Sequence, residues 1–289
     1  MKYFKAINYW VLGGFAGDKS AVAAIDDAKS MGLDGIELTF DGCIKTDITE
    51  KECRDIAGYA KAQGIGLRSM ATGTYWGLSL GSPDAAMRDK AIEFTKKYLQ
   101  VANWLGVENI LVVPGAVQVG WDPSQPVVPY QEMWDNSTAS LKQLLPLAEK
   151  LKVNICIENV WNKFLLSPIE MKCYIDQFNS DFIGSYFDVG NVLLNGFPEH
   201  WIAILGKRVK AVHFKNFKGQ DCGGGLHGFG DDLTDGEVNF KQIIAELDKI
   251  GFNGPITAEM IPFCRLPDLV LPDMELARNT AAKLKQILA

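Results

Sequence analysis

Four residues whose side chains bind cations or transfer protons stand near the ends of four consecutive apolar runs of the chain. They are Glu158, Asp188, His213 and Glu259. A buried carboxylate without a partner is costly, so three carboxylates that face one another require a cation. Three carboxylates and one imidazole form a hard, oxygen-rich ligand set for one divalent ion. The set predicts a site for Mn2+, with Mg2+, Co2+ and Zn2+ as alternatives.

Each of these four residues has an ordinary structural interpretation when it is considered alone. A glutamate at the end of a strand is more often a helix cap or an ion-pair partner. A single histidine in a strand is more often a core residue with its hydrogen bonds satisfied. The metal-site prediction therefore depends on all four occurring at equivalent positions of successive runs.

The two glutamates of the set also suit proton transfer. A metal that bridges a ketone oxygen and a neighbouring hydroxyl stabilises an enediolate, and a carboxylate can then remove the adjacent proton near neutral pH. In an epimerisation, Glu158 and Glu259 would serve opposite faces of one carbon as the catalytic pair. In a 1,2-isomerisation, a single base would carry the proton between adjacent carbons. The sequence does not choose between these reactions.

Eight further residues near the ends of apolar runs are predicted to contact a sugar substrate. They are Asn8, Trp10, Glu37, Trp161, Asn162, Asn191, Lys215 and Lys218. Core or rim packing is an equally good interpretation of the aromatic residues, and Glu37 is interpreted equally well as an ion-pair partner. A substrate phosphate would seek Lys163, Lys215, Lys218 or backbone amides of residues 223–230. Phosphorylation of the substrate is left open.

The elements that must position these residues alternate along the chain. Short apolar runs occupy residues 3–9, 35–40, 65–70, 109–114, 153–160, 183–189, 209–214 and 255–260. Segments of helical period occupy residues 19–31, 49–63, 84–105, 130–151, 168–178, 199–205, 240–250 and 274–288. This alternation is typical of a parallel sheet with right-handed crossovers.

Eight such units in 289 residues predict an α/β fold, a closed (β/α)8 TIM barrel. A doubly wound open sheet is the alternative, but Gly13, Gly14 and Gly17 do not have the spacing of its phosphate turn. The absence of a composition break predicts one domain over residues 1–289. The glycine-rich loop at 217–239 is interpreted as a lid, and replacement of Gly223–Gly225 by alanine is expected to lower turnover.

Local signals mark several helix ends. Gly32, Gly64, Gly106 and Gly251 follow periodic segments and predict helix stops. The pairs Ser82-Pro83 and Ser167-Pro168 predict helix starts.

Composition excludes several classes of protein. The chain is 47% hydrophobic and 10% aromatic, which excludes an intrinsically disordered protein. Its net charge of -6 argues against a nucleic-acid partner. No apolar segment is long enough for a membrane span, and the first residues do not resemble a signal peptide. Six scattered cysteines indicate reduced thiols, so we expect a cytoplasmic protein, with a homo-oligomer left open.

Five short segments resemble the sugar-phosphate isomerase/epimerase family, which has a xylose-isomerase-like TIM barrel. They are Ile157-Glu158-Asn159, the run from Trp161 to Pro168, Phe187-Asp188-Val189-Gly190-Asn191, Val212-His213-Phe214-Lys215-Asn216 and Ala258-Glu259. The resemblance is to its ketose 3-epimerase-like and hexulose-6-phosphate isomerase-like members. It implies that Glu158, Asp188, His213 and Glu259 hold a divalent metal and that the two glutamates exchange protons with the substrate, a ketose or ketose phosphate.

Two positions depart from the epimerase pattern. A histidine three residues after the aspartate is replaced by Asn191, and an arginine six residues after the histidine is replaced by Gly219. Two other functions remain as alternatives: a lyase that dehydrates keto-inositols, and a sugar- or metal-binding barrel without turnover. A barrel-type AP endonuclease normally needs more histidines than the three of this acidic chain.

Overall fold

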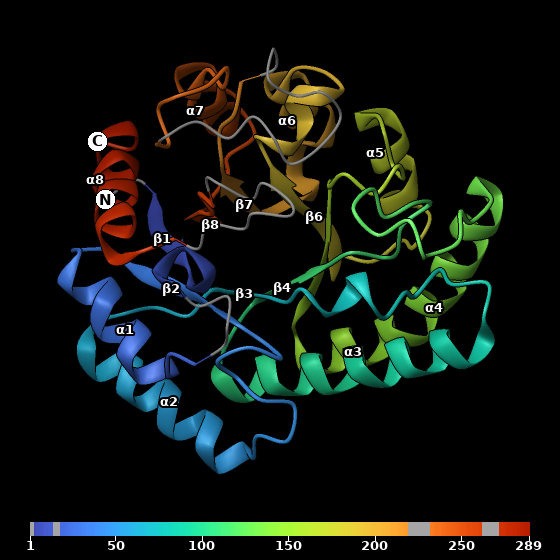
Figure 1. The fold of residues 1–289 in the computed structure, drawn as a ribbon, viewed down its shortest axis with the longest axis horizontal. Coiled ribbons are helices and arrows are strands. Elements are labelled where there is room, and N and C mark those ends of the chain that lie inside the picture. The colour runs from blue at the N-terminus through green and yellow to red at the C-terminus, as the bar shows by residue number, and fades with distance from the viewer. Residues whose placement is uncertain (1–2, 14–17, 219–231, 262–271) are drawn as a thin grey trace.

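The computed structural model describes residues 3–13, 18–218, 232–261 and 272–289. Eight parallel strands form a closed barrel in the order of the sequence, and β1 pairs with β8 to complete the ring (Figure 1). The strands are β1 (Phe4–Asn8), β2 (Gly35–Thr39), β3 (Ser69–Ala71), β4 (Asn109–Val112), β5 (Asn154–Glu158), β6 (Ile183–Asp188), β7 (Val209–Phe214) and β8 (Pro255–Ala258). The predicted (β/α)8 barrel is confirmed.

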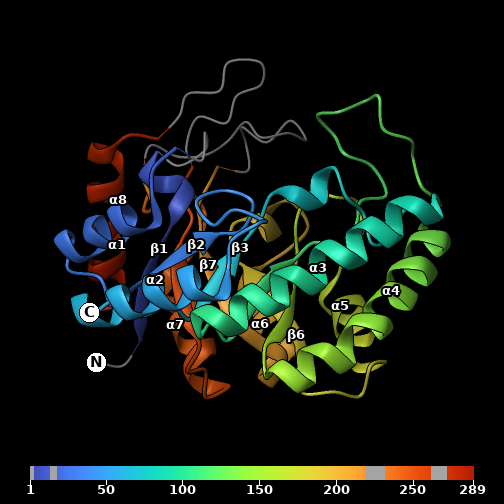
Figure 2. The same cartoon turned by 90° about the horizontal axis from the view of Figure 1, so that it is seen from below.

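Helices cover the outside of the barrel, as Figures 1 and 2 show. They are α1 (Ala21–Ser30), α2 (Glu50–Gln63), α3 (Ala85–Leu105), α4 (Tyr130–Leu151), α5 (Pro168–Asp176), α6 (Pro198–Leu205), α7 (Phe240–Lys249) and α8 (Met274–Ile287). Short 3-10 helices follow three of the strands: η1 (Tyr9–Leu12), η3 (Thr74–Trp76) and η4 (Asn191–Leu194), and η5 (Gly206–Arg208) precedes β7. Each long helix turns an apolar stripe onto the strands, which builds one continuous core between the two layers.

Capping residues explain where several helices begin and end. Thr49 and Glu52 form a reciprocal capping box at the start of α2, which ends at Gly64 with φ of 74°. The predicted stop at Gly64 is thus confirmed, as is the start at Ser167-Pro168. The prediction at Ser82-Pro83 is wrong by two residues. Asp84 is the N-cap of α3, because its side chain accepts the backbone N–H of Ala86.

The third strand begins later than its apolar run predicts. Ile65 and Leu67 are buried, but Gly66 makes only an isolated bridge to Gly35, and β3 starts at Ser69. The apolar pattern here reports burial in the turn between α2 and β3 rather than strand pairing. The ring of Phe4 fills the space beside Gly35 and Gly66, so that neither residue has room for a side chain.

Strand register brings the candidate residues to one rim of the barrel. Asn8 of β1 lies opposite Glu37 of β2, and Asp188 of β6 lies opposite His213 of β7. These are carboxyl ends of parallel strands, where the active sites of barrel enzymes lie. Residues 223–225 of the predicted lid lie outside the described part of the chain, so the lid remains a prediction. Among the described helices, none has the length and apolar character needed to cross a membrane.

Candidate metal centre and active site

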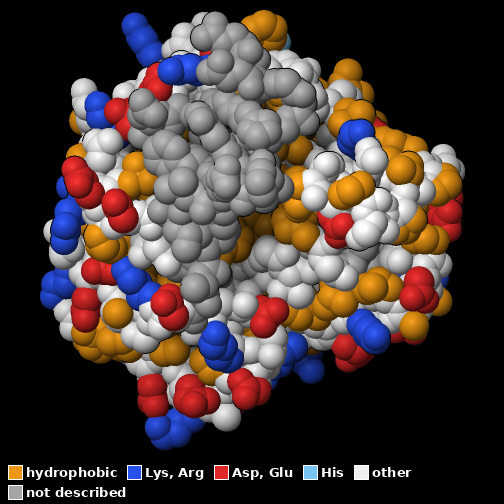
Figure 3. All heavy atoms as spheres, in the orientation of Figure 1, with side chains coloured by type: hydrophobic (Ala, Val, Ile, Leu, Met, Phe, Trp, Pro, Cys, Tyr) orange, Lys and Arg blue, Asp and Glu red, His pale blue; other side chains and the backbone are white. Residues whose placement is uncertain are grey.

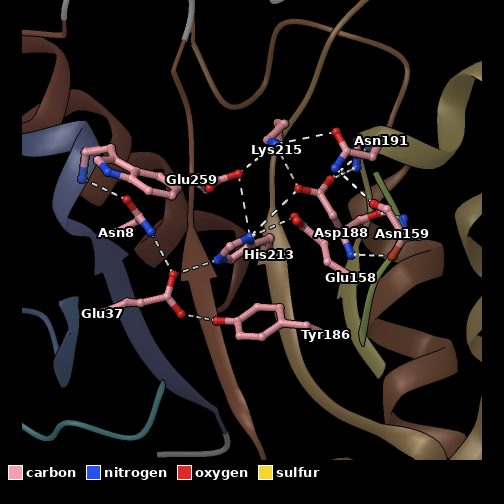
Figure 4. Close-up of polar contacts among 12 residues, drawn as sticks. Asn8, Glu37, Glu158, Asn159, Tyr186, Asp188, Asn191, His213, Lys215 and Glu259 are labelled. Atoms are coloured by element: carbon pink, nitrogen blue, oxygen red, sulfur yellow. Dashed lines mark hydrogen bonds and ion pairs between the residues drawn. The ribbon is translucent and has the colours of Figure 1, made fainter. Parts of the chain in front are cut away.

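The four predicted ligands converge at the rim of the barrel. Glu158, Asp188, His213 and Glu259 each offer an atom to a cluster in which all four atoms lie within 4.8 Å of one another. All four side chains are buried. The Nδ1 atom of His213 lies 3.7 Å from Glu158 Oε1, 3.9 Å from Asp188 Oδ2 and 3.5 Å from Glu259 Oε2 (Figure 4). The cluster therefore brings three carboxylate oxygens around one imidazole nitrogen.

The donor set fits a divalent cation. Asp188 Oδ2 and His213 Nδ1 are buried atoms that both face the cluster; Asp188 Oδ2 is ion-paired with Lys215, and His213 Nδ1 lies 3.5 Å or more from each of the three carboxylates. Buried polar atoms are nearly always hydrogen-bonded, so a buried imidazole nitrogen that faces three carboxylates at these distances fits the role of a cation ligand. The ligand types are those of a hard oxygen-rich site. Lys215 supplies positive charge beside the cluster, with Nζ 2.9 Å from Asp188 Oδ2 and 2.6 Å from Glu259 Oε2.

Glu37 orients His213 through Nε2, the ring nitrogen that faces away from the ligand cluster. Its Oε1 atom lies 2.7 Å from Nε2 of His213 and accepts a 2.7 Å hydrogen bond from Asn8 Nδ2. The hydroxyl of Tyr186 donates to its other oxygen. With Nε2 held as the donor to a carboxylate, Nδ1 is left to face the ligand cluster. Of the two roles that the sequence left open for Glu37, its contacts are those of an ion-pair partner.

Two asparagines and a tight turn orient the aspartate. Asn159 bonds both backbone groups of Asp188: its Oδ1 accepts from the N–H at 2.9 Å and its Nδ2 donates to the C=O at 2.8 Å. The Oδ1 atom of Asp188 accepts the backbone N–H groups of Gly190 and Asn191, both at 2.8 Å. One carboxylate oxygen is thereby fixed by the turn, and the other, Oδ2, is left for the cluster.

Burial and charge shift the protonation of this cluster. Burial raises the pKa of Glu158 to about 7; the nearby imidazole of His213 opposes the rise, and the negative charge of Glu259 adds to it. Burial by itself would lower the pKa of His213, but the carboxylates of Glu259 and Glu37 raise it well above its ordinary value. Carboxyl and imidazole groups of the metal-free protein therefore carry protons that a cation must displace.

Affinity for Mn2+ is expected to rise with pH for this reason. Metal ligands must be deprotonated, and Glu158, with a pKa of about 7, and His213 hold protons in the metal-free protein. Each released proton contributes up to about a tenfold rise in affinity per pH unit. Calorimetric titrations with Mn2+ between about pH 6 and pH 8, in buffers of different ionisation enthalpy, measure the dissociation constant and the number of protons released. A dissociation constant that is constant over this range, without proton release, would contradict the assignment.

The predicted substrate contacts divide into two groups. Trp10, Trp161, Asn191 and Lys215 line a cavity of about 220 Å3 that also contacts Glu158 and Glu259. The other four are engaged elsewhere: Asn8 with Glu37, Glu37 with His213, Asn162 with the backbone of Gly115 and Phe164, and Lys218 with Asp235 at 3.0 Å. Of the phosphate candidates, Lys163 bonds Gln118 and is exposed. The structure thus brings half of the predicted contacts to the cavity.

Sequence reasoning assigned no site role to several residues that the structure brings into the site. Tyr186 and Asn159 hold Glu37 and Asp188, and Thr72 and Trp121 line the cavity. A polar residue inside an apolar strand was an available signal for Tyr186. No periodic pattern marks Trp121, because it lies in the irregular segment between β4 and α4.

Comparison with known proteins assigns the fold to a family. A family described as xylose isomerase-like TIM barrel matches residues 25–287. The L-ribulose-5-phosphate 3-epimerase UlaE of Escherichia coli O1:K1 / APEC is 25% identical over 251 residues, which cover 81% of this chain and 79% of the relative.

Solved structures of two sugar epimerases have the same fold. A D-psicose 3-epimerase from Clostridium cellulolyticum H10, solved with D-tagatose, has a TM-score of 0.74 at 18% identity, covering 100% of this chain and 97% of its own. The 3-keto-D-glucoside 4-epimerase YcjR from E. coli has a TM-score of 0.73 at 13% identity, covering 99% and 100%. With a family match that spans nearly all of its length, the present chain belongs to the xylose isomerase-like TIM barrel family.

Proposed function

We propose that the protein is a divalent-metal-dependent sugar epimerase that inverts a carbon next to the ketone of a ketose. The observation that carries the proposal is the placement of Glu158 and Glu259. Their carboxylates lie 3.7 Å and 3.5 Å from His213 Nδ1, reach the site from the ends of β5 and β8, and both line the same cavity (Figure 4). Two carboxylates that enter one cavity from strands separated by two others can serve the two faces of one carbon.

The relatives support this reaction class. The similar proteins include 3-epimerases of L-ribulose 5-phosphate and D-psicose and a 4-epimerase of a 3-keto-glucoside. In each named reaction, the inverted carbon is adjacent to the carbonyl carbon, and its hydrogen is therefore acidic. A base on one face and an acid on the other suffice to invert such a carbon.

The residues of the cavity have different proposed roles in proton transfer and substrate binding. Glu158, whose pKa burial raises to about 7, is suited to hold or give a proton near neutral pH. Glu259 lies 2.6 Å from the ammonium group of Lys215 at the same cavity and is the proposed opposing base. Lys215 and Asn191 face the same cavity and supply hydrogen bonds to substrate oxygens. A divalent ion, when bound, polarises the ketone and stabilises negative charge on its oxygen.

Mn2+ is the ion that we propose for the centre, because the oxygen-rich set with one imidazole suits it. Glu158, Asp188, His213 and Glu259 would hold it. We also propose that residues 1–289 function as one domain, since the ligands come from strands β5 to β8 and their supporting contacts from β1, β2 and β6.

Solvent-proton incorporation tests the reaction. Incubation of the Mn2+-loaded protein in D2O with a panel of ketoses and ketose phosphates is expected to place deuterium on the carbon that is inverted, with formation of its epimer. Label at C1 or C2 with an aldose product would identify a 1,2-isomerase instead. Loss of water would identify a lyase. Protein treated with a chelator is the control, and no label in any sugar would contradict an enediolate mechanism and leave a binding role.

A further inference from the structure

The cavity above the cluster has walls of a specific chemical character. Its described lining contains four tryptophans, four aliphatic residues, one glycine and five polar or charged residues. The apolar residues are Trp10, Trp76, Trp121, Trp161, Leu111, Val113, Val160 and Ile261. Figure 3 shows a hollow near the centre of the view, with hydrophobic side chains beside it. The carboxylates of Glu158 and Glu259 lie in the same lining, so one end of a ligand meets the metal cluster and the rest meets indole rings.

Protein contacts hold these indoles in place. The rings of Trp76 and Trp121 meet edge to face with centroids 4.5 Å apart. The indole N–H of Trp161 donates to the backbone of Asn191 at 3.1 Å, and its ring meets Phe217 edge to face at 5.5 Å. Trp10, Trp76, Trp121 and Trp161 are all only partly buried. Their apolar faces are therefore fixed before a ligand arrives, which lowers the entropy lost on binding.

The charges around the cavity disfavour an anionic ligand group. Among the described residues of its lining, Lys215 carries the only positive charge, and that ammonium group already contacts Asp188 and Glu259. Lys163 and Lys218 bind Gln118 and Asp235 and do not belong to this lining. A phosphate needs cations or several N–H donors, and a dianion against indole walls loses its hydration without replacement.

We propose that the cavity selects a small ketose without a phosphate group. The inference rests on the proposed function and deepens it by naming the substrate class. The ketone and the adjacent hydroxyl lie toward Glu158, Glu259 and Lys215, and the carbon chain with its C–H groups lies against the indole faces. A volume of about 220 Å3 suits one monosaccharide, because it is below the range of roughly 300–1,000 Å3 found for drug-sized ligands.

Matched pairs of substrates test the selection. We compare kcat/KM of the Mn2+-loaded protein for L-ribulose with L-ribulose 5-phosphate, and for D-fructose with D-fructose 6-phosphate. The sugar without phosphate is expected to be favoured by about 100-fold or more, the penalty for a buried, uncompensated charge. A preference for either phosphate ester overturns the inference while leaving the proposed epimerase function intact.

Binding is measured separately from turnover. Four of the seven tryptophans of the chain line the cavity, so a bound sugar is expected to change the intrinsic fluorescence. If no ketose is converted, the proposed function fails, and these titrations still decide the inference. Tighter binding of the unphosphorylated member supports it. Tighter binding of the phosphate ester, or no response to either member, overturns it.

One substitution replaces an apolar side chain of the cavity wall with a positively charged one. Trp121→Arg places a cation at the cavity and is expected to shift the ratio of kcat/KM values toward the phosphate ester by about tenfold or more. Trp104→Phe is the matched control, because Trp104 lies in α3, packs under Lys97 and is not part of the cavity. The control is expected to leave the ratio unchanged. An equal ratio in Trp121→Arg and the parent protein would contradict the role of this wall.

Discussion

Glu158→Gln and Glu259→Gln are each expected to lower net epimerisation by about 10²–10⁴-fold, the usual contribution of a positioned acid or base. Glutamine has nearly the same shape as glutamate but cannot carry the transferred proton. Both residues line the cavity and lie within 3.7 Å of His213 Nδ1, so each substitution changes a group at the site and leaves the barrel intact. Rates are compared at saturating Mn2+, because the same side chains are proposed ligands.

Solvent exchange separates the two glutamates. Each variant is expected to retain wash-in of deuterium into one epimer only, since the remaining glutamate still serves one face of the carbon. Glu93→Gln is the control: Glu93 pairs with Lys96 on the surface of α3, where 70% of its side chain is exposed. Full turnover in either active-site variant would contradict the assignment of that residue as an acid or base.

The barrel and its four proposed metal ligands were predictable because the carboxyl ends of parallel strands meet at one rim. Glu158, Asp188 and His213 stand at or next to the last residue of an apolar strand. Such a side chain lies at the rim of the barrel, where the neighbouring strands also end. Glu37 has the same sequence pattern, but it lies in the middle of β2, and its carboxylate faces His213 Nε2 and lies outside the described cavity lining. The sequence does not encode the height and direction that distinguish Glu37 from Glu158.

Two lysines also show that the sequence does not encode the direction of a side chain. Lys215 and Lys218 lie three residues apart and were predicted alike as substrate contacts. Lys215 continues the line of β7 and its side chain enters the site beside Asp188, with only 9% of that side chain exposed. Lys218 lies beyond the strand and pairs with Asp235, with 38% of its side chain exposed. Strand periodicity ends at Phe214, so it gives no direction for either lysine.

Asp188→Asn is expected to weaken Mn2+ binding by more than about 100-fold, beyond the 10–100-fold effect of residues that only support a ligand. Asparagine can keep the Oδ1 hydrogen bonds to the backbone of Gly190 and Asn191, so the turn is preserved. The other carboxylate oxygen, which faces the cluster and the ammonium group of Lys215, becomes an amide nitrogen that cannot bind a cation. His213→Ala removes the nitrogen ligand and is expected to have a similar effect.

Glu37→Gln is the comparison that separates a ligand from its support. Glu37 touches Nε2 of His213 and not the cluster, so its loss is expected to weaken Mn2+ binding by about 10–100-fold while roughly one ion per chain still binds at saturation. Metal content by elemental analysis and dissociation constants by electron paramagnetic resonance give both values, and circular dichroism checks that each variant is folded. In its supporting role, Glu37 fixes which imidazole nitrogen carries the hydrogen. A loss of Mn2+ affinity in Glu37→Gln as large as that in Asp188→Asn would contradict this role and make Glu37 a ligand. Unchanged metal content and affinity in both Asp188→Asn and His213→Ala would remove the metal centre from this rim.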